Sequence, residues 1–474
     1  MTKRGLTRRF FIGSALSFGA FGGCRFLTVP SGSASSGTPN LTFGMLSDIH
    51  ILGANAAPDE FCDLRGDAKV FRAALEWLRD RQVDAVMISG DLADYGMVEE
   101  LDEVAKAWEA VFPGNRAPDG RVVEKLFTSG NHEINGFLYD DYAKVKFPDP
   151  VERRKHVLRG DFARHWERIL GEPYAHFFRK EVKGYTFLST HWGDDTDMSV
   201  GWCKNLFGVE LQEFLDKRGN AFDPSQPFFY FQHPHLKDTC FGPWAWGRDD
   251  GKSTAALSRF GNAVAFSGHA HYPLTDERAI WQGAFTSVGA PSLRFAEMPK
   301  DARRPGRYED ERPRGDSPQG MLVKVFDDRI VISRHEFPSG ASLGDDWVIP
   351  TGEDRPYAFA ARARKSKAPQ FADDARLTVR RAAAFELEFP PATAEREARV
   401  YEYEVVATGR SGETKTFHVL ASGFNRPQNG AAANGKNRLS LAAERVPKDV
   451  VRFSVTPLDC WWNRGREISE RMKA

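Results

Sequence analysis

The chain has 474 residues, which is too long for one ordinary hydrophobic core and favours two or three domains. Lysine plus arginine and aspartate plus glutamate balance at 65 each, and the isoelectric point is near 7.2. A neutral chain offers no field that would concentrate polyanions, so bulk nucleic-acid binding is not indicated. The five cysteines are scattered, without the close pairs of a zinc ribbon or the density of a disulfide scaffold.

Residues 1–38 have the features of an export signal and spacer rather than of a folded element. A twin arginine, Arg8 and Arg9, precedes a short glycine-rich apolar stretch, and a serine- and glycine-rich spacer follows. This arrangement resembles a bacterial twin-arginine signal, so we expect a periplasmic, cell-surface or extracellular protein. A disordered basic tail is the alternative interpretation. Cys24 is a candidate lipidation site, which would attach the mature protein to a membrane.

From residue 39 the pattern changes to alternating apolar runs and amphipathic segments, which is typical of an α/β (α+β) fold with helices covering sheets. Phe71, Ala74, Leu75 and Leu78 share one helical face, which predicts a helix over 70–81. Apolar residues at helical spacing predict a second helix over 101–112. Apolar runs predict strands over 41–47, 84–89, 122–129, 184–190, 227–232 and 263–267.

Short polar clusters directly follow all of these strands except the one that ends at Thr190. In layered α/β folds, the loops at the carboxyl ends of strands converge on one edge, where ligand sites gather. Side chains that are distant in sequence can therefore meet there. The clusters are Asp48-Ile49-His50, Gly90-Asp91-Leu92-Ala93-Asp94, Gly130-Asn131-His132-Glu133, His233-Pro234 and Gly268-His269-Ala270-His271.

These residue types suit the hydrolysis of a phosphate ester. A catalyst must neutralise the phosphoryl oxygens and generate a nucleophile near neutral pH, and two metal ions about 3.5–4 Å apart do both. Asp91 is the candidate bridge between the ions, because its charge can offset both cations and small residues flank it. Mixed carboxylate, amide and imidazole ligands suit Mn, Fe or Zn better than Ca. The sequence therefore predicts a metal-dependent phosphoester hydrolase.

The order Asp-x-His, Gly-Asp-x-x-Asp, Gly-Asn-His-Glu, a lone His and Gly-His-x-His resembles the calcineurin-like metallophosphoesterase superfamily, from residue 41 to about residue 335. The resemblance implies two sheets packed as a sandwich, flanked by helices, with the site at one edge. It also implies that His132 stays unligated and contacts the phosphoryl group or protonates the leaving alkoxide. The implied metal ligands are Asp48, His50, Asp91 and His271 for one ion, and Asp91, Asn131, His233 and His269 for the other.

Two positions depart from common patterns of the superfamily. Purple acid phosphatases, one of its branches, usually carry a metal-binding tyrosine three residues after the bridging aspartate, and Asp94 stands there instead. A charge-transfer tyrosinate site is therefore not expected, and Asp94 is interpreted as support for the ligands. Glu133 stands where many relatives have aspartate, a change expected to matter little. Taken singly, aspartate and asparagine at these places can also be turn formers or helix caps, and His132 can instead orient a ligand.

The connecting segments are long where specificity would be set. Segments 136–178 and 236–259 are rich in aromatics, which would either stack on a base or sugar ring or pack the loop against the domain. His191, His235 and the acidic run 194–197 are further candidates for the pocket wall. Segment 291–320 is dense in arginine, proline and aspartate, which predicts a solvated surface excursion.

The C-terminal part has a purely β pattern. Phe385, Leu387 and Phe389 alternate with charged residues, and similar runs follow between turn-rich stretches. This pattern is similar to a fibronectin type III or immunoglobulin-like module, without a diagnostic motif. The expected domains are a signal and spacer (1–38), a catalytic domain (39–345), a linker (346–372) and a β-sandwich (373–474).

The expected function is that of an exported hydrolase with two metal ions, in which a metal-bound hydroxide attacks phosphorus. A phosphodiesterase is the preferred prediction. A phosphomonoesterase or nucleotidase of the same fold is the alternative, because both substrates present a phosphoryl group to the same ligands. A non-catalytic surface binding protein, in which the β-sandwich makes the contacts, is the alternative from another class.

Overall fold

The computed structural model describes residues 37–52, 68–134, 142–192, 207–243, 245–297, 307–308, 317–395, 399–421 and 435–472. The twin arginine, Cys24, the acidic run 194–197 and Trp244 lie outside these ranges. No helix in these ranges is both long enough and apolar enough to cross a membrane.

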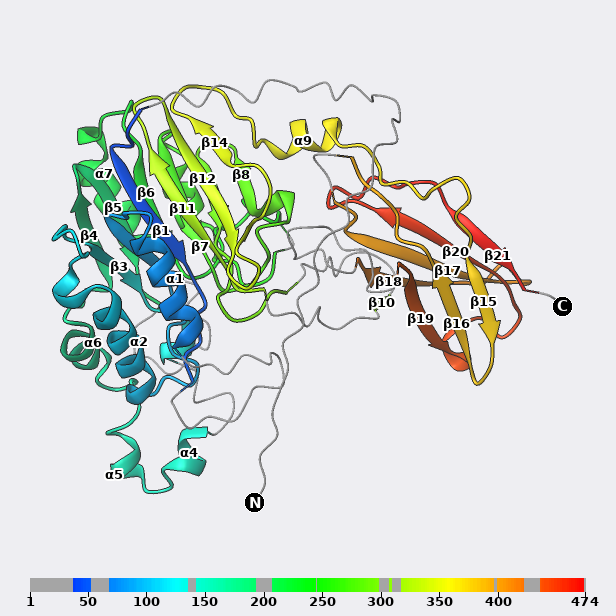
Figure 1. Ribbon diagram of the computed structural model, residues 1–474, viewed down its shortest axis with the longest axis horizontal. Helices are drawn as coiled ribbons and strands as arrows, with labels where there is room; N and C mark the ends of the chain where they lie inside the picture. The colour runs from blue at the N-terminus through cyan, green and yellow to red at the C-terminus, as the bar shows by residue number, and fades with distance from the viewer. Residues whose placement is uncertain are drawn as a thin grey trace, which may run out of the picture. The chain divides into compact units, whose positions relative to one another are not determined.

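Seven strands form the first sheet: β1 (Leu41–Leu46), β2 (Ala85–Ser89), β3 (Glu124–Thr128), β11 (Gln319–Val325), β12 (Arg329–Glu336), β13 (Ala341–Ser342) and β14 (Trp347–Pro350). Their order is β13-β12-β11-β1-β2-β3, with β14 also paired to β12 (Figure 1). Strands β1, β2 and β3 are parallel, and β11 is antiparallel to β1. The carboxyl ends of the first three strands therefore meet at one edge.

Six strands form the second sheet: β4 (Phe177–Val182), β5 (Tyr185–Thr190), β6 (Phe228–Gln232), β7 (Ala263–Ser267), β8 (Ile280–Gln282) and β9 (Thr286–Gly289). Their order is β4-β5-β6-β7-β9-β8, and β5, β6, β7 and β9 run parallel to one another.

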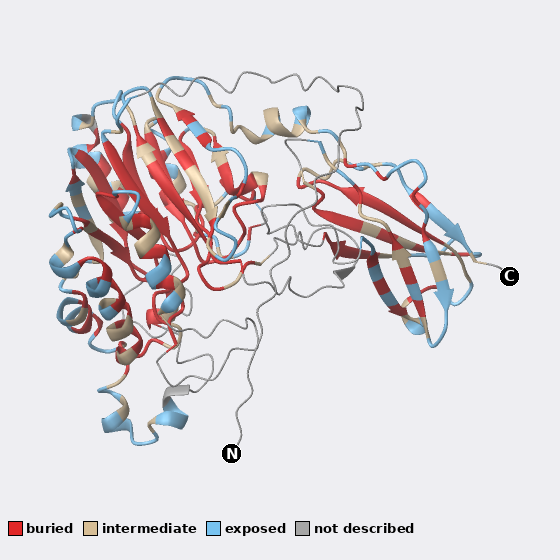
Figure 2. Cartoon of the chain, in the orientation of Figure 1, coloured by how far each residue is buried: buried red, intermediate tan, exposed pale blue. Residues whose placement is uncertain are grey.

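The two sheets pack face to face through alternate side chains of their strands. Phe43 of β1 contacts the rings of Phe187, Phe229 and Phe266 of the second sheet, at centroid distances of 5.3, 5.0 and 5.9 Å. Leu46, three residues further along β1, points to the opposite face and belongs to the core under the helices, because strand side chains alternate between faces. Figure 2 shows the strands of both sheets as largely buried. The predicted α/β fold class, a two-sheet sandwich flanked by helices, is confirmed.

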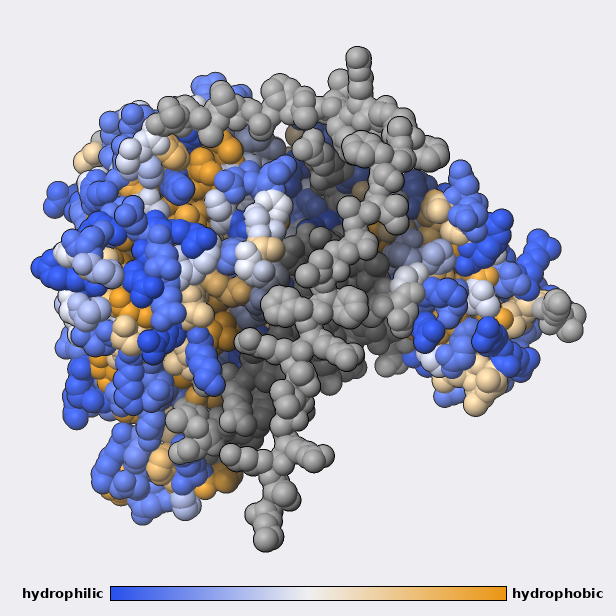
Figure 3. Space-filling model, in the orientation of Figure 1, coloured by the Kyte–Doolittle hydropathy of each residue, from blue (hydrophilic) through white to orange (hydrophobic). Residues whose placement is uncertain are grey.

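Helices cover the outer face of each sheet. α1 (Lys69–Arg79), α2 (Val98–Val111) and α6 (Phe162–Leu170) pack on the first sheet, whereas α7 (Val209–Arg218) and α8 (Lys252–Leu257) pack on the second. In α1 the four apolar residues that predicted the helix are the buried ones, so the helix predicted over 70–81 is confirmed. On the face seen in Figure 3, hydrophilic side chains dominate over α1, α2 and α6, as amphipathic helices require.

The C-terminal part is all-β, as predicted. A three-stranded sheet contains β15 (Thr378–Arg381), β16 (Ala384–Phe389) and β19 (Asn437–Ala442), and a five-stranded sheet contains β10 (Arg307–Tyr308), β17 (Glu402–Gly409), β18 (Thr414–Leu420), β20 (Val450–Leu458) and β21 (Ile468–Arg471). Phe385, Leu387 and Phe389 are buried in one core with Tyr403 and Val405.

Two segments carry more regular structure than their composition indicates. The expected linker 346–372 contains β14, which extends the first catalytic sheet, and the helix α9 (Phe359–Lys365). Residues 291–294, expected on the surface, are buried. Further along the same segment, β10 pairs in parallel with β18 of the C-terminal part. The hydrophilic composition of segment 291–320 gave no sign of the burial of residues 291–294 or of the pairing between β10 and β18.

Candidate metal centre

The predicted site residues stand directly after the carboxyl ends of strands from both sheets. Asp48 and His50 follow β1, Asp91 follows β2, and Asn131 follows β3. The second sheet contributes His233 after β6, and His269 and His271 after β7. All seven side chains are buried. The structure therefore brings together at one edge the residues that the sequence placed at separate strand exits.

The first cluster contains Asp48, His50, Asp91 and His271, whose ligand atoms all lie within 4.8 Å of one another. His50 Nε2 and His271 Nε2 are 3.0 Å apart. Asp48 Oδ1 lies 3.2 Å from His271 Nε2, and Asp91 Oδ2 lies 3.6 Å from His50 Nε2.

The second cluster contains Asp91, His233 and His269 within the same 4.8 Å limit. Asp91 Oδ2 is 3.0 Å from His233 Nε2, and His269 Nδ1 is 3.1 Å from that same nitrogen. Asn131 Oδ1 also lies 3.1 Å from His233 Nε2, so its amide oxygen belongs to this cluster. Asp91 is the residue that the two clusters share.

Hydrogen bonds at the far side of three imidazoles fix their tautomers. His50 Nδ1 donates to Asp94 Oδ1 at 2.8 Å, His271 Nδ1 to the Phe295 carbonyl at 3.2 Å, and His233 Nδ1 to the Ser89 carbonyl at 2.7 Å. Each Nε2 is then left with a lone pair that faces the clusters. Two such lone pairs 3.0 Å apart, as in His50 and His271, repel each other unless a cation lies between them.

The backbone at the site is strained in a consistent way. Eleven non-glycine residues in the described ranges have positive φ, and five of them are site residues: Asp48 (50°), His50 (49°), Asp91 (52°), His269 (74°) and His271 (55°). Such conformations cost of order 1–3 kcal/mol each and cluster at functional sites. The loops that carry these side chains therefore lower the stability of the folded protein in order to direct the side chains toward one point.

Two motif glycines leave room for the clusters. A Cβ at Gly130 would lie 2.1 Å from Asp91 Oδ1, and a Cβ at Gly90 would lie 2.5 Å from His233 Nδ1. Gly90 also has φ of 106°, which an L side chain rarely adopts. Any larger residue at these positions would push ligand atoms apart.

The pKa shifts in the clusters indicate that positive charge is stabilised there. Burial opposes ionisation of Asp91, but His233 and His132 hold the pKa of its carboxyl well below the usual range. Burial lowers the pKa of His233, but Asp91 and Asp48 outweigh it and raise that pKa to about 9. Burial and the neighbouring His233 lower the pKa of His269 well below its ordinary value. Ionised carboxylates close to several imidazole nitrogens fit the binding of divalent cations, which would displace a proton from His233.

His132 stands beside the clusters but in neither of them. Its side chain is 27% exposed, in contrast to the seven buried residues. Its Nδ1 donates to the Asp94 carbonyl at 2.6 Å. Burial lowers the pKa of His132, but Asp91 and Asp94 raise it above the ordinary value. The imidazole therefore holds its proton to a higher pH than a free histidine does.

Glu133 ties two of the site loops together. Its buried carboxyl accepts hydrogen bonds from the amides of Gly130 at 2.6 Å, Ala93 at 2.7 Å and Asp91 at 3.2 Å. The change from aspartate to glutamate, expected to matter little, thus supplies a side chain that reaches the loops after both β2 and β3.

Sequence reasoning missed two residues that support the first cluster. Ser292 Oγ donates to the Asp48 carbonyl at 3.0 Å, and Arg294 Nη1 donates to the His50 carbonyl at 2.5 Å. The prediction of a solvated excursion was wrong for this part of segment 291–320. The available signal was β9, a short strand parallel to β7, whose exit this loop forms.

His191 and His235 were candidates for the pocket wall, but both are buried and bonded to neighbouring strand-end residues. His191 Nδ1 accepts from the Ser129 amide at 3.0 Å, and His235 Nδ1 lies 2.9 Å from Ser267 Oγ. Burial lowers the pKa of each imidazole to about 3, so both are neutral. Neither belongs to the metal-ligating groups found among the described residues.

Two aromatic rings flank the clusters. Trp246 stacks on His269 with ring centroids 4.6 Å apart, and its side chain is 54% exposed. Phe295 packs on His271 with centroids 4.2 Å apart. Each of the two clusters therefore has an aromatic neighbour.

One family model and several solved structures are similar to this chain. Residues 41–273 match the family model described as calcineurin-like phosphoesterase, whereas no curated protein sequence matches the chain. A dimetal phosphatase structure from Danio rerio is 15% identical, with 66% of this chain and 100% of that chain covered and a TM-score of 0.41. A purple acid phosphatase structure from yellow lupin seeds is 14% identical, with 66% and 55% covered and a TM-score of 0.41. Residues 41–273 form a calcineurin-like phosphoesterase domain, and the chain is a hydrolase acting on phosphoester bonds.

Proposed function

We propose that this phosphoester hydrolase holds two metal ions bridged by Asp91 and acts on phosphodiesters. The sharing of Asp91 between two clusters of ligand atoms is the observation that carries the proposal. Asp48, His50 and His271 would complete the first site, and Asn131, His233 and His269 the second. Mn, Fe or Zn suit these mixed ligands.

The bound ions would neutralise the phosphoryl oxygens and make a nucleophile available near neutral pH. The chain's own contribution to bond breaking lies in His132. Because its Nδ1 donates to the Asp94 carbonyl, the proton available to a leaving group sits on Nε2. The raised pKa of His132 keeps that proton in place to a higher pH than in a free histidine, which favours a general acid.

The two flanking rings favour a diester over a monoester. Trp246 lies on a histidine of the second cluster, and Phe295 lies on a histidine of the first. A phosphodiester carries an organic group on two sides of phosphorus, so both rings would have a partner. A monoester would leave one of the rings without one.

Matched aryl phosphate diester and monoester substrates test the proposal, with metal-reconstituted protein and a chelated control. We expect metal-dependent turnover with preference for the diester, and about two metal ions per chain by elemental analysis. Asp91→Ala and His269→Ala should abolish turnover and leave the circular dichroism spectrum unchanged, and Asp216→Ala on the exposed face of α7 serves as control. Near-normal turnover in either site variant would disprove the site, and preference for the monoester would disprove the diesterase.

Export by the twin-arginine route is part of the proposal and rests on Arg8, Arg9 and the apolar stretch after them. Replacing both arginines by lysine should retain the protein in the cytoplasm of a bacterial host. Cys24→Ser tests lipidation separately, because it should release a lipid-anchored protein from the membrane fraction and leave a cleaved, soluble protein unchanged. Export of the double-lysine variant at the normal level would contradict the route.

A further inference from the structure

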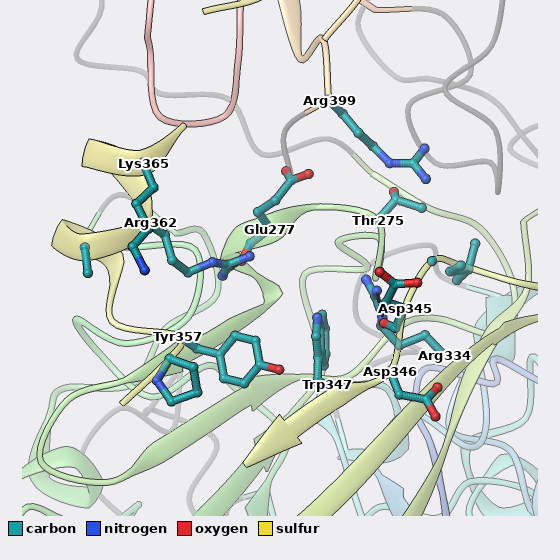
Figure 4. A pocket seen from close by; sticks show the side chains of 14 residues that line it. Thr275, Glu277, Arg334, Asp345, Asp346, Trp347, Tyr357, Arg362, Lys365 and Arg399 are labelled. Carbon is teal, nitrogen blue, oxygen red and sulfur yellow. Dashed lines mark hydrogen bonds between the residues drawn. The ribbon is translucent and has the colours of Figure 1, made fainter. Parts of the chain in front are cut away.

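A cavity of about 430 Å³ lies apart from the metal centre and shares none of its residues. Its wall comes from β12, from the turn before β14, from α9 and from the 3₁₀ turn η3 (Glu277–Ala279). Figure 4 shows Lys365 and Arg362 on α9 at one side of the cavity and Arg334 at the other side, with Glu277 in the space between α9 and Arg334. Volumes of this size are typical of small-molecule sites.

Backbone carbonyls hold two of the cations of this cavity, Arg334 and Arg362. Arg334 donates from Nη1 to the Leu274 carbonyl at 2.8 Å and from Nη2 to the Asp345 carbonyl at 2.7 Å. Arg362 donates to the Glu277 carbonyl. Among the described residues, neither arginine forms an ion pair, and Lys365 has neither an ion pair nor a hydrogen bond. The Nε of Arg334 is buried and has no hydrogen-bond partner there.

The carboxyl groups of the wall do not balance this charge. Burial and the neighbouring Asp276 raise the pKa of Glu277 to about 7, and its carboxyl accepts a hydrogen bond from Cys460. Asp345 and Asp346 are exposed to solvent at the turn before β14, where water screens their charge.

The guanidinium groups are also fixed in place before any ligand arrives. Arg334 lies 4.3 Å from the Trp347 ring centroid, and Arg362 lies 5.5 Å from that of Tyr357. The Tyr357 hydroxyl is held in turn by the Val348 amide at 2.7 Å. Preorganised donors lose little conformational entropy on binding, which favours recognition of an anion.

We propose that this cavity binds a small polyanion whose phosphate or carboxylate oxygens contact Arg334, Arg362 and Lys365. Burial lowers the pKa of Arg334 to about 10. The Glu277 carboxyl opposes this shift, and the charges of Arg399 and Arg362 add to it. The site is independent of the phosphoesterase chemistry, because it uses no residue of the metal centre.

Isothermal titration calorimetry tests the proposal on the full chain after metals are stripped and the chelator is removed by gel filtration. Stripping prevents capture of the anion by the metal centre and makes the result independent of the proposed function. Pyrophosphate and citrate are the probes, because one offers phosphate oxygens and the other carboxylate oxygens. We expect one of them to bind with one-to-one stoichiometry and a Kd below about 1 mM.

Lys365→Glu should weaken that binding by about tenfold or more, since it replaces a positively charged donor with a carboxylate that repels the anionic probe. Lys367→Glu is the matched control, because Lys367 is a neighbouring exposed lysine that pairs with Glu395 and does not line the cavity. Binding of neither probe, unchanged affinity in Lys365→Glu, or an equal loss in Lys367→Glu would each overturn the proposal.

Discussion

The Asp94→Asn substitution removes one negative charge between His50 and His132 while it preserves the size of the side chain. In the native protein, Asp94 Oδ1 accepts from His50 Nδ1 at 2.8 Å and so directs the Nε2 lone pair of His50 toward the first cluster. Asp94 Oδ2 also lies 3.6 Å from Nη1 of Arg294, which is buried. The substitution therefore weakens the orientation of a ligand and leaves a buried cation less compensated.

The size of the effect follows from the bond to His50. A hydrogen bond to a charged group contributes about 1.5–3 kcal/mol, which corresponds to about 10–150-fold in an equilibrium constant. Loss of an acceptor behind a ligating histidine typically costs about 10–100-fold in metal affinity or activity. We expect metal affinity at the first site to fall within this range, and turnover to recover in part at saturating metal.

The pH profile gives a second readout. Asp94 is one of the carboxylates that raise the pKa of His132, so its neutralisation lowers that pKa. The proton on His132 is then lost at lower pH, and the alkaline fall of activity on substrates with poor leaving groups should move to lower pH.

Competition with a chromophoric chelator measures the affinity, and metal-saturated rates measure the profile. Asp216→Asn, at an exposed aspartate that bonds Gln212, is the control. Metal affinity and a pH profile equal to those of the control would refute the assigned role of Asp94.

Three further outcomes are expected. His132→Ala should lower turnover by about 10²–10⁴-fold with alkoxide leaving groups and much less with nitrophenolate, a difference that leaving-group kinetics would reveal; an equal loss for both would remove its role as acid. Glu133→Gln can keep its amide oxygen at the place of Oε2, which accepts two hydrogen bonds, but it then turns an amide donor toward the Ala93 N–H, so the metal-free protein should lose about 1–3 kcal/mol in urea unfolding. The partly exposed Glu103→Gln should change little. Arg278→Met strands the buried carboxylate of Asp276, with which Arg278 pairs at 2.6 Å, and should cost about 3–5 kcal/mol; an unchanged unfolding midpoint would contradict this.

Local sequence patterns were sufficient to locate the strands and the residues at their exits. β1, β2 and β7 are short apolar runs that end in Asp-x-His, Gly-Asp or Gly-His-x-His, so both the element and its polar exit are visible within a few residues. The helical face of α1 was equally legible, because the period of its apolar residues matches the helix turn.

Segment 291–320 shows where this reasoning failed. Its composition is that of a solvated loop, yet Ser292 and Arg294 bond the backbone of Asp48 and His50, and β10 joins a sheet of the C-terminal part. Composition reports the average preference of a segment for water. The partner that buries a particular arginine or serine lies more than two hundred residues away and leaves no local trace.

The sequence by itself determined the ligand types, their strand exits and the two-part organisation, because period, turn chemistry and residue type are local properties. Only the tertiary structure decided that Asp91 lies in both clusters, that Glu133 binds two loops, and that Arg334 and Arg362 face one cavity, where both donate hydrogen bonds to backbone carbonyls. Such relations depend on how two sheets stack and where chain segments cross, so they exist only after the long-range contacts have formed.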